Sequence, residues 1–426
     1  MRARQWTALA VAAILGAAGV AKAEPTRPLA TATVAPDPRL GAEGTPPPAP
    51  IAAPEEACGG ENWAALAESR AMSAPLGLPP VIHPDDNPPT AARIELGRHL
   101  FFDRRLSVNG TMSCAMCHVP EQGFTSHELR TAVGVEGRGV KRNAPTLLNV
   151  AHVTELFHDG RDPALETQYL GPLLAMNEMA NPSAGQVVAR LAALPEYRAL
   201  FDAAFGAAPS IDRIGAALAA YERSLVAGAS PFDRWLYGGE PTAIGPDARR
   251  GHALFTGKAG CADCHRIGEQ DALLTDNDFH DTGYGFMRES ERQAPPPVAT
   301  VEVAPGVVYQ VSRDYIASVG GTREPDLGRY EATGRPQDVW KFRVPSLRNV
   351  ALTPPYMHDG GLPDLGAVID FYDGGGHPHP GQDERVRPLG LSPDEKADLV
   401  AFLNSLTSPA VACLAGEARI LRPGNY

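Results

Sequence analysis

The chain has 426 residues and a formal net charge of −12, because 50 Asp and Glu residues outnumber 38 Lys and Arg residues. A chain of this length can form two domains with sizeable cores. We expect no nucleic-acid partner, because phosphate contacts need clustered Lys and Arg side chains and this sequence has no basic block. An acidic surface can instead steer a basic protein partner.

The N-terminus has the pattern of a signal peptide. Two arginines precede a short apolar run that ends in Ala21-Lys22-Ala23, so residues 1–23 are predicted to be removed by cleavage after Ala23. The alternative is an uncleaved N-terminal anchor. No later stretch approaches the ~18–20 apolar residues of a membrane span, so we expect an exported, periplasmic protein with no membrane span in the mature chain.

Residues 24–55 are rich in Pro, Ala and Thr, as in PPPAPIAAPEE. Such a segment cannot bury enough apolar surface to offset the entropy of ordering it, so we predict a disordered leader. The folded part is expected to begin near Cys58.

Helical patterns dominate the remainder of the chain. Residues 211–226 place their apolar side chains on one helical face. Residues 392–406 begin with Ser392 and Glu395 at the spacing of a capping box. The predicted fold class is therefore mostly α.

Strand-like alternation is scarce. Residues 298–311 predict a small hairpin, which lies inside a Pro-rich insertion of about residues 291–320. We interpret this insertion as a long surface loop.

Two of the three cysteine pairs lie in Cys-x-x-Cys-His motifs. The motif residues are Cys114, Cys117 and His118 in CAMCH, and Cys261, Cys264 and His265 in CADCH. Such a motif attaches c-type haem through both thiols, and its histidine reaches the iron from the same turn. Zinc binding is the alternative, but it would need a fourth ligand at each site. The sequence therefore predicts two covalently bound haem c groups with both histidines as iron ligands.

The remaining cysteines, Cys58 and Cys413, flank the folded region at its two ends. An even pair left over in an oxidising compartment predicts a disulfide. Two free buried thiols are the alternative. If the bridge forms, the C-terminal tail returns to the N-terminal domain.

The sequence contains an internal repeat. Residues 145–160 and 345–360 match without gaps at an offset of 200, with eight of sixteen positions identical. Each copy follows a Cys-x-x-Cys-His motif, so the repeat predicts a duplicated one-haem unit. We expect an N-terminal haem domain of residues 56–238, joined by the tail 408–426, and a C-terminal haem domain of residues 239–407.

The ordered motifs CxxCH, RNAPTLLNV, FHDGR, CxxCH, VPSLRNVALTPPYMHDGG and DFYDGGG resemble those of the bacterial di-haem cytochrome c peroxidase and MauG family over about residues 85–410. The resemblance implies two mostly helical cytochrome-c-like domains with the haems near their interface. It also implies that the haem bound by His118 reacts with peroxide, and that the haem bound by His265 stores or passes electrons.

The resemblance further implies how peroxide is cleaved. The family uses a glutamate as general acid–base, helped by a glutamine, and the matching positions are Glu178 and Gln168. Without the resemblance, such a glutamate would be interpreted as part of a solvated helix face. The peroxidases can carry a distal histidine at the position of Val135, which has no ligating atom, so the first iron is expected to be open.

A calcium site and an electron route also depend on the resemblance. The family's calcium ligands match the Asn143 side chain and the backbone carbonyls of Thr353 and Pro355, although Asn143 could instead cap a turn. Many members place a tryptophan between the haems, where this chain has His158. Histidine is harder to oxidise, so electrons are expected to tunnel directly or to use another aromatic residue.

Tyr372 stands where the peroxidases carry the methionine that ligates the C-terminal iron, and MauG has a tyrosine at this place. A tyrosine packed in the core is the alternative, with Met357 then the candidate ligand. A thioether stabilises ferrous iron and raises the reduction potential, whereas a phenolate favours oxidised iron. The tyrosine places the chain in the MauG-like branch of the family.

These features predict a periplasmic di-haem oxidoreductase that uses hydrogen peroxide and shares oxidising equivalents between its haems. The electron donor would be a small redox protein, such as a cytochrome c or a cupredoxin, or a protein side chain that is oxidised as in MauG. The alternative is a non-enzymatic di-haem electron carrier. It would need two strong ligands at both irons, and Val135 argues against it.

Overall fold

The computed structural model describes residues 62–291, 298–304, 307–312 and 325–419. The predicted signal peptide, the predicted leader of residues 24–55 and Cys58 lie outside these residues, as does part of the Pro-rich insertion. Within the described part of the chain, no helix combines the length and the apolar character needed to cross a membrane.

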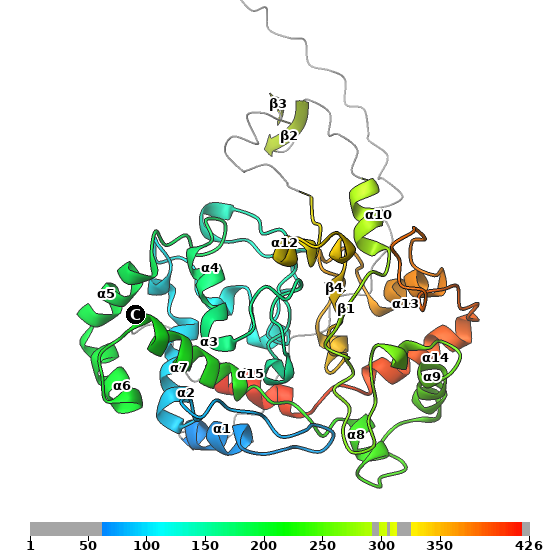
Figure 1. Cartoon of the computed structure of the whole chain (residues 1–426), viewed down its shortest axis with the longest axis horizontal. Coiled ribbons are helices and arrows are strands. Elements are labelled where there is room, and N and C mark those ends of the chain that lie inside the picture. The colour runs from blue at the N-terminus through cyan, green and yellow to red at the C-terminus, as the bar shows by residue number, and fades with distance from the viewer. Residues whose placement is uncertain (1–61, 292–297, 305–306, 313–324, 420–426) are drawn as a thin grey trace, which may run out of the picture. The chain divides into compact units, whose positions relative to one another are not determined.

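Helices are the main regular structure of the described residues, which contain few strands (Figure 1). The α-helices of the first half are α1 (Trp63–Ala71), α2 (Ala91–Phe102), α3 (Leu165–Gln168), α4 (Leu170–Leu174), α5 (Ala184–Ala193), α6 (Pro195–Phe205) and α7 (Ile211–Arg223). Those of the second half are α8 (Pro231–Leu236), α9 (Pro246–Thr256), α10 (Tyr284–Ser290), α12 (Tyr330–Thr333), α13 (Leu365–Asp373), α14 (Pro393–Asn404) and α15 (Ala410–Arg419).

Short 3₁₀ helices connect many of these elements. They are η3 (Arg104–Leu106), η4 (Cys114–Met116), η5 (Pro120–Gln122), η6 (Val135–Gly137), η7 (Val150–His152), η8 (Cys261–Asp263), η9 (Pro336–Asp338) and η10 (Val350–Leu352). Both Cys-x-x-Cys-His motifs begin with such a turn.

The described strands form two antiparallel pairs. β1 (Phe279–His280) pairs with β4 (Phe342–Arg343), so that Phe279 lies opposite Arg343. β2 (Val298–Ala304) pairs with β3 (Val307–Ser312), which confirms the hairpin predicted from the sequence.

Two predicted helices are confirmed with small differences at their ends. The helix predicted for residues 211–226 is α7, which Ser210 caps and which ends at Arg223. It ends early because the Ser224 hydroxyl donates to the carbonyl of Tyr221, an alternative to continuing the helical ladder. The capping box predicted at Ser392 is present at the start of α14.

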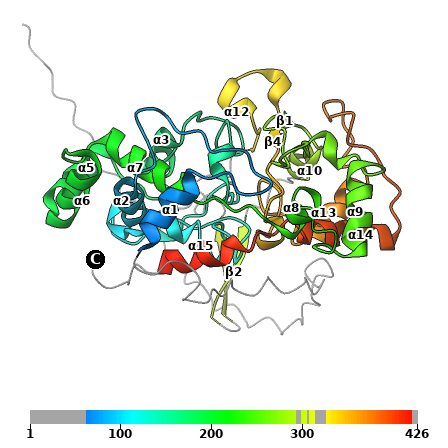
Figure 2. The ribbon, with the colours of Figure 1, turned by 90° about the horizontal axis from the view of Figure 1, so that it is seen from below.

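Each haem motif follows a helix that crosses a later helix at a glycine. A Cβ on Gly97 of α2 would lie 1.9 Å from the carbonyl oxygen of Ala217 in α7. A Cβ on Gly251 of α9 would lie 2.0 Å from the carbonyl oxygen of Asp398 in α14. Only glycine permits this approach, so α2 lies beside α7 and α9 lies beside α14 (Figures 1 and 2). These contacts position the turns that follow α2 and α9.

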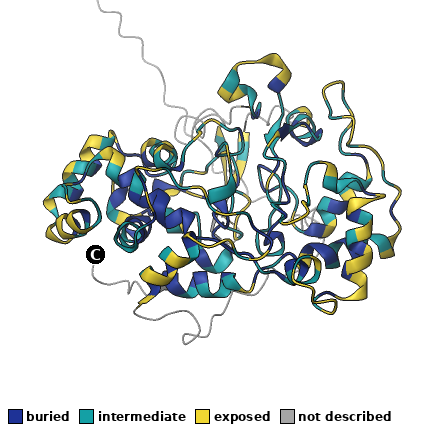
Figure 3. Ribbon diagram, turned by 60° about the horizontal axis from the view of Figure 1, so that its bottom comes forward, coloured by how far each residue is buried: buried dark blue, intermediate teal, exposed yellow. Residues whose placement is uncertain are grey.

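Buried apolar side chains form two clusters. Figure 3 marks the buried residues along the ribbon. The first includes Leu100 of α2, Leu218 of α7 and, from the tail, Val411 of α15. The second includes Phe255 of α9 and Phe402 of α14. The domain boundaries given above remain a prediction.

The two copies of the repeat share local structure. Asn149 and Asn349 both adopt the left-handed conformation, with φ of 61° and 62°. The Asn149 side-chain oxygen accepts a hydrogen bond from the backbone N–H of Ala227 at 2.7 Å, and the Asn349 oxygen accepts one from the N–H of Ser408 at 2.8 Å. Duplication of a one-haem unit remains the interpretation of this likeness.

Candidate active site

The first Cys-x-x-Cys-His motif forms a compact turn. The backbone N–H of His118 donates to the carbonyl of Cys114 at 3.0 Å, so both thiols and the ring lie on one short loop. The His118 ring donates from Nδ1 to the carbonyl of Phe124 at 3.1 Å, which leaves Nε2 unprotonated. Burial lowers the pKa of His118, so its ring is neutral and able to ligate iron.

The second motif repeats this geometry. The N–H of His265 donates to the carbonyl of Cys261 at 2.9 Å, and its Nδ1 donates to the carbonyl of Leu274 at 2.9 Å. Burial likewise lowers the pKa of His265. Phe124 and Leu274, the two acceptors, both have positive φ, which turns their carbonyls toward the rings.

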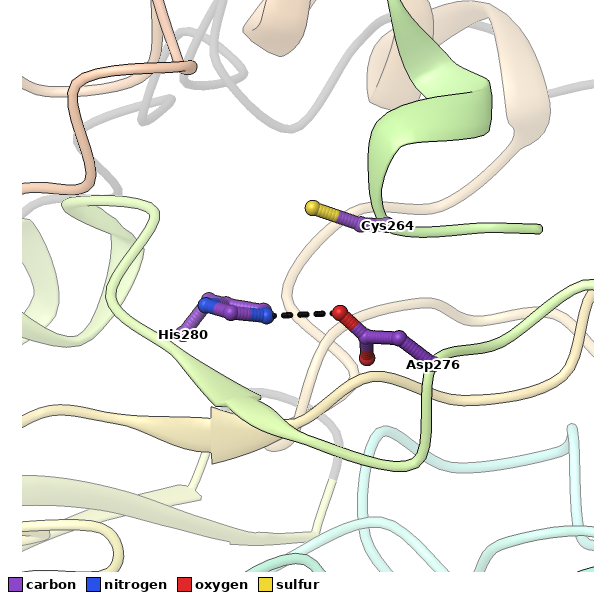
Figure 4. Close-up of side chains that lie close together, drawn as sticks. All are labelled: Cys264, Asp276 and His280. Carbon is purple, nitrogen blue, oxygen red and sulfur yellow. Dashed lines mark hydrogen bonds and ion pairs between the residues drawn. The ribbon is translucent and has the colours of Figure 1, made fainter.

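The side chains of both motifs fit covalently attached haem. The four motif cysteines are free thiols, which the attachment of haem to two motifs requires. Within the described residues, the group of His, Cys, Asp and Glu side chains close enough to hold a metal ion is Cys264, Asp276 and His280 (Figure 4). Cys264 of the second motif belongs to this group, whereas neither motif histidine does.

His280 links the second motif to nearby carboxylates. Its Nε2 lies 2.8 Å from Asp276 Oδ2, and its Nδ1 lies 3.0 Å from Asp383 Oδ2. Figure 4 shows the Cys264 sulfur beside the pair formed by His280 and Asp276.

A cavity joins the first motif to the residues predicted for peroxide cleavage. His118, Gln168 and Glu178 line it together. Gln168 ends α3, and Glu178 follows α4 in a loop, so the fold brings segments 50 to 60 residues apart to one space. The remaining lining residues are Phe101, Leu106, Met112, Ser113, Cys114, Cys117, Leu147, Tyr169, Pro172, Leu173, Met179, Leu218 and Glu222.

Burial changes the acidity of Glu178. It raises the pKa of the carboxyl above the usual value of a glutamate, and the charge of Arg161 opposes that shift. A buried carboxyl with a raised pKa holds its proton more readily than an exposed glutamate does. Val135 packs in the first apolar cluster, and its backbone N–H donates to the carbonyl of Glu178 at 2.9 Å.

Glu222 is a second acidic residue in this cavity that sequence reasoning missed. Burial raises its pKa to about 8, while Arg223 acts in the opposite direction. Its place on α7 is one turn after Leu218, on the apolar face. A charged residue on that face was the signal that could have identified it.

Tyr372 lies in the last turn of α13, beside the second motif. Burial and the neighbouring thiols of Cys261 and Cys264 raise the pKa of its phenol. The phenol oxygen therefore lies in the region where that haem would attach. Met357, the other candidate, lies in the loop before α13 with a φ of 71°.

The predicted calcium ligands come from loops that contact each other. Asn143 is buried, and its Nδ2 donates to the carbonyl of Arg130 at 2.9 Å, which leaves Oδ1 as the atom that a cation would use. The N–H of Asn143 donates to the carbonyl of His358 at 2.7 Å. Thr353 and Pro355 precede His358 in the same loop.

His158 lies beside Asn143, where these loops contact each other. Its Nε2 donates to the carbonyl of Asn143 at 2.9 Å, and its own carbonyl accepts from the N–H of Arg343 at 2.8 Å. Burial and the charge of Arg142 lower the pKa of His158 to about 3, so the ring is neutral. His158 of the first repeat copy is therefore hydrogen-bonded to Arg343, which lies just before the second copy.

The tail carries the remaining described cysteine. Cys413 in α15 is disulfide-bonded, and α15 packs against the first apolar cluster. Cys58 lies outside the described residues, so its pairing with Cys413 stays a prediction.

Helices dominate the regular structure of the chain, and two such turns each present a neutral histidine beside two free thiols. These features define a di-haem c-type protein.

A sequence model described as di-haem cytochrome c peroxidase matches residues 91–241. Methylamine utilization protein MauG of Methylorubrum extorquens is 40% identical over 336 residues, which cover 78% of this chain and 83% of that protein. Cytochrome-c peroxidase IdrP1 of Denitromonas iodatirespirans is 38% identical over 362 residues, which cover 82% and 91%.

Solved structures show the same likeness. A MauG-like protein associated with microbial copper homeostasis has a TM-score of 0.65 and 32% identity, covering 80% of this chain and 96% of that one. The diheme peroxidase BthA of Burkholderia thailandensis shares the fold, with a TM-score of 0.61 at 24% identity, covering 80% and 93%. The chain belongs to the di-haem cytochrome c peroxidase family, and it is an oxidoreductase of that class with two haem cofactors.

Proposed function

We propose that this enzyme reacts with hydrogen peroxide at the haem held by Cys114, Cys117 and His118. The observation that carries the proposal is the shared cavity, where Gln168 and Glu178 face the same space as His118. Haem iron supplies the site at which the O–O bond of peroxide is broken.

Glu178 moves the proton in this proposal. Its buried carboxyl takes the proton from the inner peroxide oxygen and returns it to the outer one, and Gln168 orients the peroxide by hydrogen bonding. Most side chains that line the cavity are apolar, and a lining that keeps bulk water out would strengthen these polar contacts. Val135 offers no ligating atom, so this position would supply no second protein ligand to the iron.

We also propose Tyr372 as the second protein ligand of the haem held by His265. The support is its place beside Cys261 and Cys264. Ligation would remove the phenol proton, and the resulting anionic oxygen favours oxidised iron. This haem would then share the oxidising equivalents with the first haem and resist simple reduction.

The electron donor is a protein in either version of the proposal. A ligand that favours oxidised iron supports oxidation of a side chain on a protein substrate. A small redox protein, such as a cytochrome c or a cupredoxin, is the other donor, and the acidic charge of the chain would steer a basic partner. Calcium at Asn143, Thr353 and Pro355 would hold together the loops between the haems.

Export to the periplasm completes the proposal. It is supported by the signal-peptide pattern of residues 1–23, by two c-type haem motifs and by the disulfide at Cys413. In this proposal the N-terminal and C-terminal haem domains have the boundaries that the sequence predicts.

Glu178→Gln tests the proton transfer. The variant keeps the shape of the side chain but cannot accept the proton, so the rate of the peroxide reaction should fall by about 10²–10⁴-fold with both haems still attached. The matched control is Glu136→Gln, an exposed glutamate that pairs with Arg138 on the same loop as Val135. A stopped-flow rate for Glu178→Gln equal to that of the control would refute the role.

A further inference from the structure

Tyr284 opens α10 as a buried phenol with an acidic partner. Only 3% of its surface is exposed, and its hydroxyl donates to Asp359 Oδ1 at 2.8 Å. Burial and this carboxylate raise the pKa of Tyr284, so the phenol keeps its proton at neutral pH. An oxidised phenol is a strong acid, and Asp359 already lies where that proton would go.

Packed rings connect this phenol to Tyr372. The rings of Tyr284 and Phe371 meet edge to face, with centroids 5.5 Å apart and planes at 84°. The rings of Phe371 and Tyr372 follow at 5.3 Å and 78°. One ring therefore separates the two phenols, and both contacts are within the range of packed aromatic pairs.

Further hydrogen bonds to Asp359 hold its carboxylate in position to accept from the Tyr284 phenol. Its Oδ2 accepts from Arg288 Nε at 2.9 Å and from Arg130 Nη2 at 2.6 Å. Its Oδ1 also accepts from the N–H of Gly361 at 2.9 Å. A Cβ on Gly361 would lie 1.9 Å from the Tyr284 oxygen, so the pair is tightly enclosed. Such enclosure holds a hydrogen bond in one geometry.

We propose that Tyr284 and Asp359 form a redox-active pair that stores one oxidising equivalent. This proposal rests on the function proposed above, in which peroxide supplies that equivalent. One electron leaves the Tyr284 phenol for the haem group that His265 and Tyr372 hold, the O–H bond breaks, and the proton moves to Asp359 Oδ1. A neutral phenoxyl radical remains. One electron from the donor protein and the return of the proton restore the phenol.

The pair also provides an oxidisable aromatic residue that is linked by contacts to His158. His158 stands where many members of the family carry a tryptophan. The Tyr284 ring meets the His358 ring edge to face at 5.6 Å. The carbonyl of His358 accepts from Asn143, whose own carbonyl accepts from His158. Tyr284 is thus connected to both copies of the repeat.

Tyr197 provides a matched control within the same chain. Its hydroxyl donates to Asp103 Oδ2 at 2.7 Å, and it is buried beside Phe201 in the first apolar cluster. Tyr197→Phe and Tyr284→Phe each remove one phenol oxygen that donates to a carboxylate, and each keeps the ring. Similar losses of stability are therefore expected from the two variants.

The experiment is freeze-quench EPR on the full holoprotein and both variants, with ring-deuterated tyrosine to identify the radical. In one arm the oxidant is hydrogen peroxide without a donor. In the other it is a flash-generated ruthenium(III) complex without peroxide. We expect a tyrosyl signal in the wild type, its loss in Tyr284→Phe and its retention in Tyr197→Phe. The haem absorption spectrum of each sample reports separately whether peroxide has reacted.

The outcomes separate this proposal from the proposed function. Haems that react with peroxide without any tyrosyl signal would overturn the role of Tyr284 and leave the peroxide reaction intact. Haem absorption spectra that do not change with peroxide, together with a Tyr284-dependent tyrosyl signal in the ruthenium arm, would overturn the proposed peroxide reaction and support the redox-active pair. A signal that persists in Tyr284→Phe, that is lost equally in Tyr197→Phe, or that is absent from both arms overturns the pair.

Discussion

The backbone N–H of Val135 donates a hydrogen bond to the carbonyl oxygen of Glu178 at 2.9 Å. The contact is possible because the preceding residue is glycine: a Cβ on Gly134 would lie 2.2 Å from the Asn177 carbonyl oxygen and 2.6 Å from Glu178 Cα. The loop that could carry a distal ligand therefore also positions the proposed acid–base.

We predict that Gly134→Ala slows the peroxide reaction, because the added methyl group displaces the backbone of Glu178. A shift of about 1 Å at a catalytic group can cost roughly 100-fold in rate. Gly139→Ala is the control, since a Cβ there meets nothing within 4 Å. Stopped-flow kinetics should separate the two variants, and equal rates would show that Glu178 tolerates the displacement.

Tyr372→Phe should change the ferric spectrum and EPR of the second haem, because the variant removes the phenol oxygen while keeping the ring. If Tyr372 only packs in the core, the change costs about 1 kcal/mol, as for a lost hydrogen bond, with unchanged spectra. Tyr356→Phe is the control, since its hydroxyl donates to the Val350 carbonyl at 2.9 Å. Spectra identical to those of the wild type would make Met357 the candidate ligand.

Glu222→Gln should make the free energy of unfolding less dependent on pH. Glu222 has a folded pKa of about 8, above the ~4.3 of an unfolded glutamate. Its contribution to the free energy of unfolding is thus fully present below the unfolded pKa and is lost as the pH rises toward 8. Between these two pKa values the folded state binds one proton more than the unfolded state. Relative to Glu222→Gln, the wild type should lose about 1–4 kcal/mol between pH 5 and pH 8.

Guanidinium unfolding of the holoprotein at several pH values measures this difference. Glu128→Gln is the control, because Glu128 is exposed and accepts only a surface hydrogen bond from Gln122 in the described contacts. Parallel pH profiles for the wild type and Glu222→Gln would mean that Glu222 is not a buried neutral acid in the holoprotein.

The pairing of Cys58 with Cys413 predicts that Cys58→Ser, Cys413→Ser and the double variant are equally destabilised, because each loses the same bridge. The chain-entropy model gives about 4–5 kcal/mol for so long a loop, less any strain in the folded state. Alkylation of the denatured, unreduced wild type should modify neither thiol. If the losses of unfolding free energy in the two single variants add up in the double variant, Cys58 and Cys413 do not form a disulfide with each other.

Local chemistry explains why the haem motifs were predictable from the sequence. Both thiols and the proximal histidine of each site lie within five consecutive residues, from Cys114 to His118 and from Cys261 to His265. The helix starts at Ser210 and Ser392 were predictable for the same reason, because a cap is made by side chains that lie within one turn of the backbone they satisfy.

Glu178 and Gln168 could be named only through the resemblance to a family. Nothing in their local pattern distinguishes them from a solvated helix face. Tyr372 was ambiguous as well, because an aromatic residue near the end of a helix packs in a core more often than it binds a metal.

The sequence by itself determined the two haem attachment turns, the mainly helical class and the repeat, because these depend on residues a few positions apart. The tertiary structure alone decided that Glu222 joins Glu178 in one cavity and that Tyr284 meets Asp359. Tyr284 and Asp359 are 75 residues apart in the chain. Contacts over such separations form when helices and loops pack, and packing is a property of the whole fold that no local pattern of residues specifies.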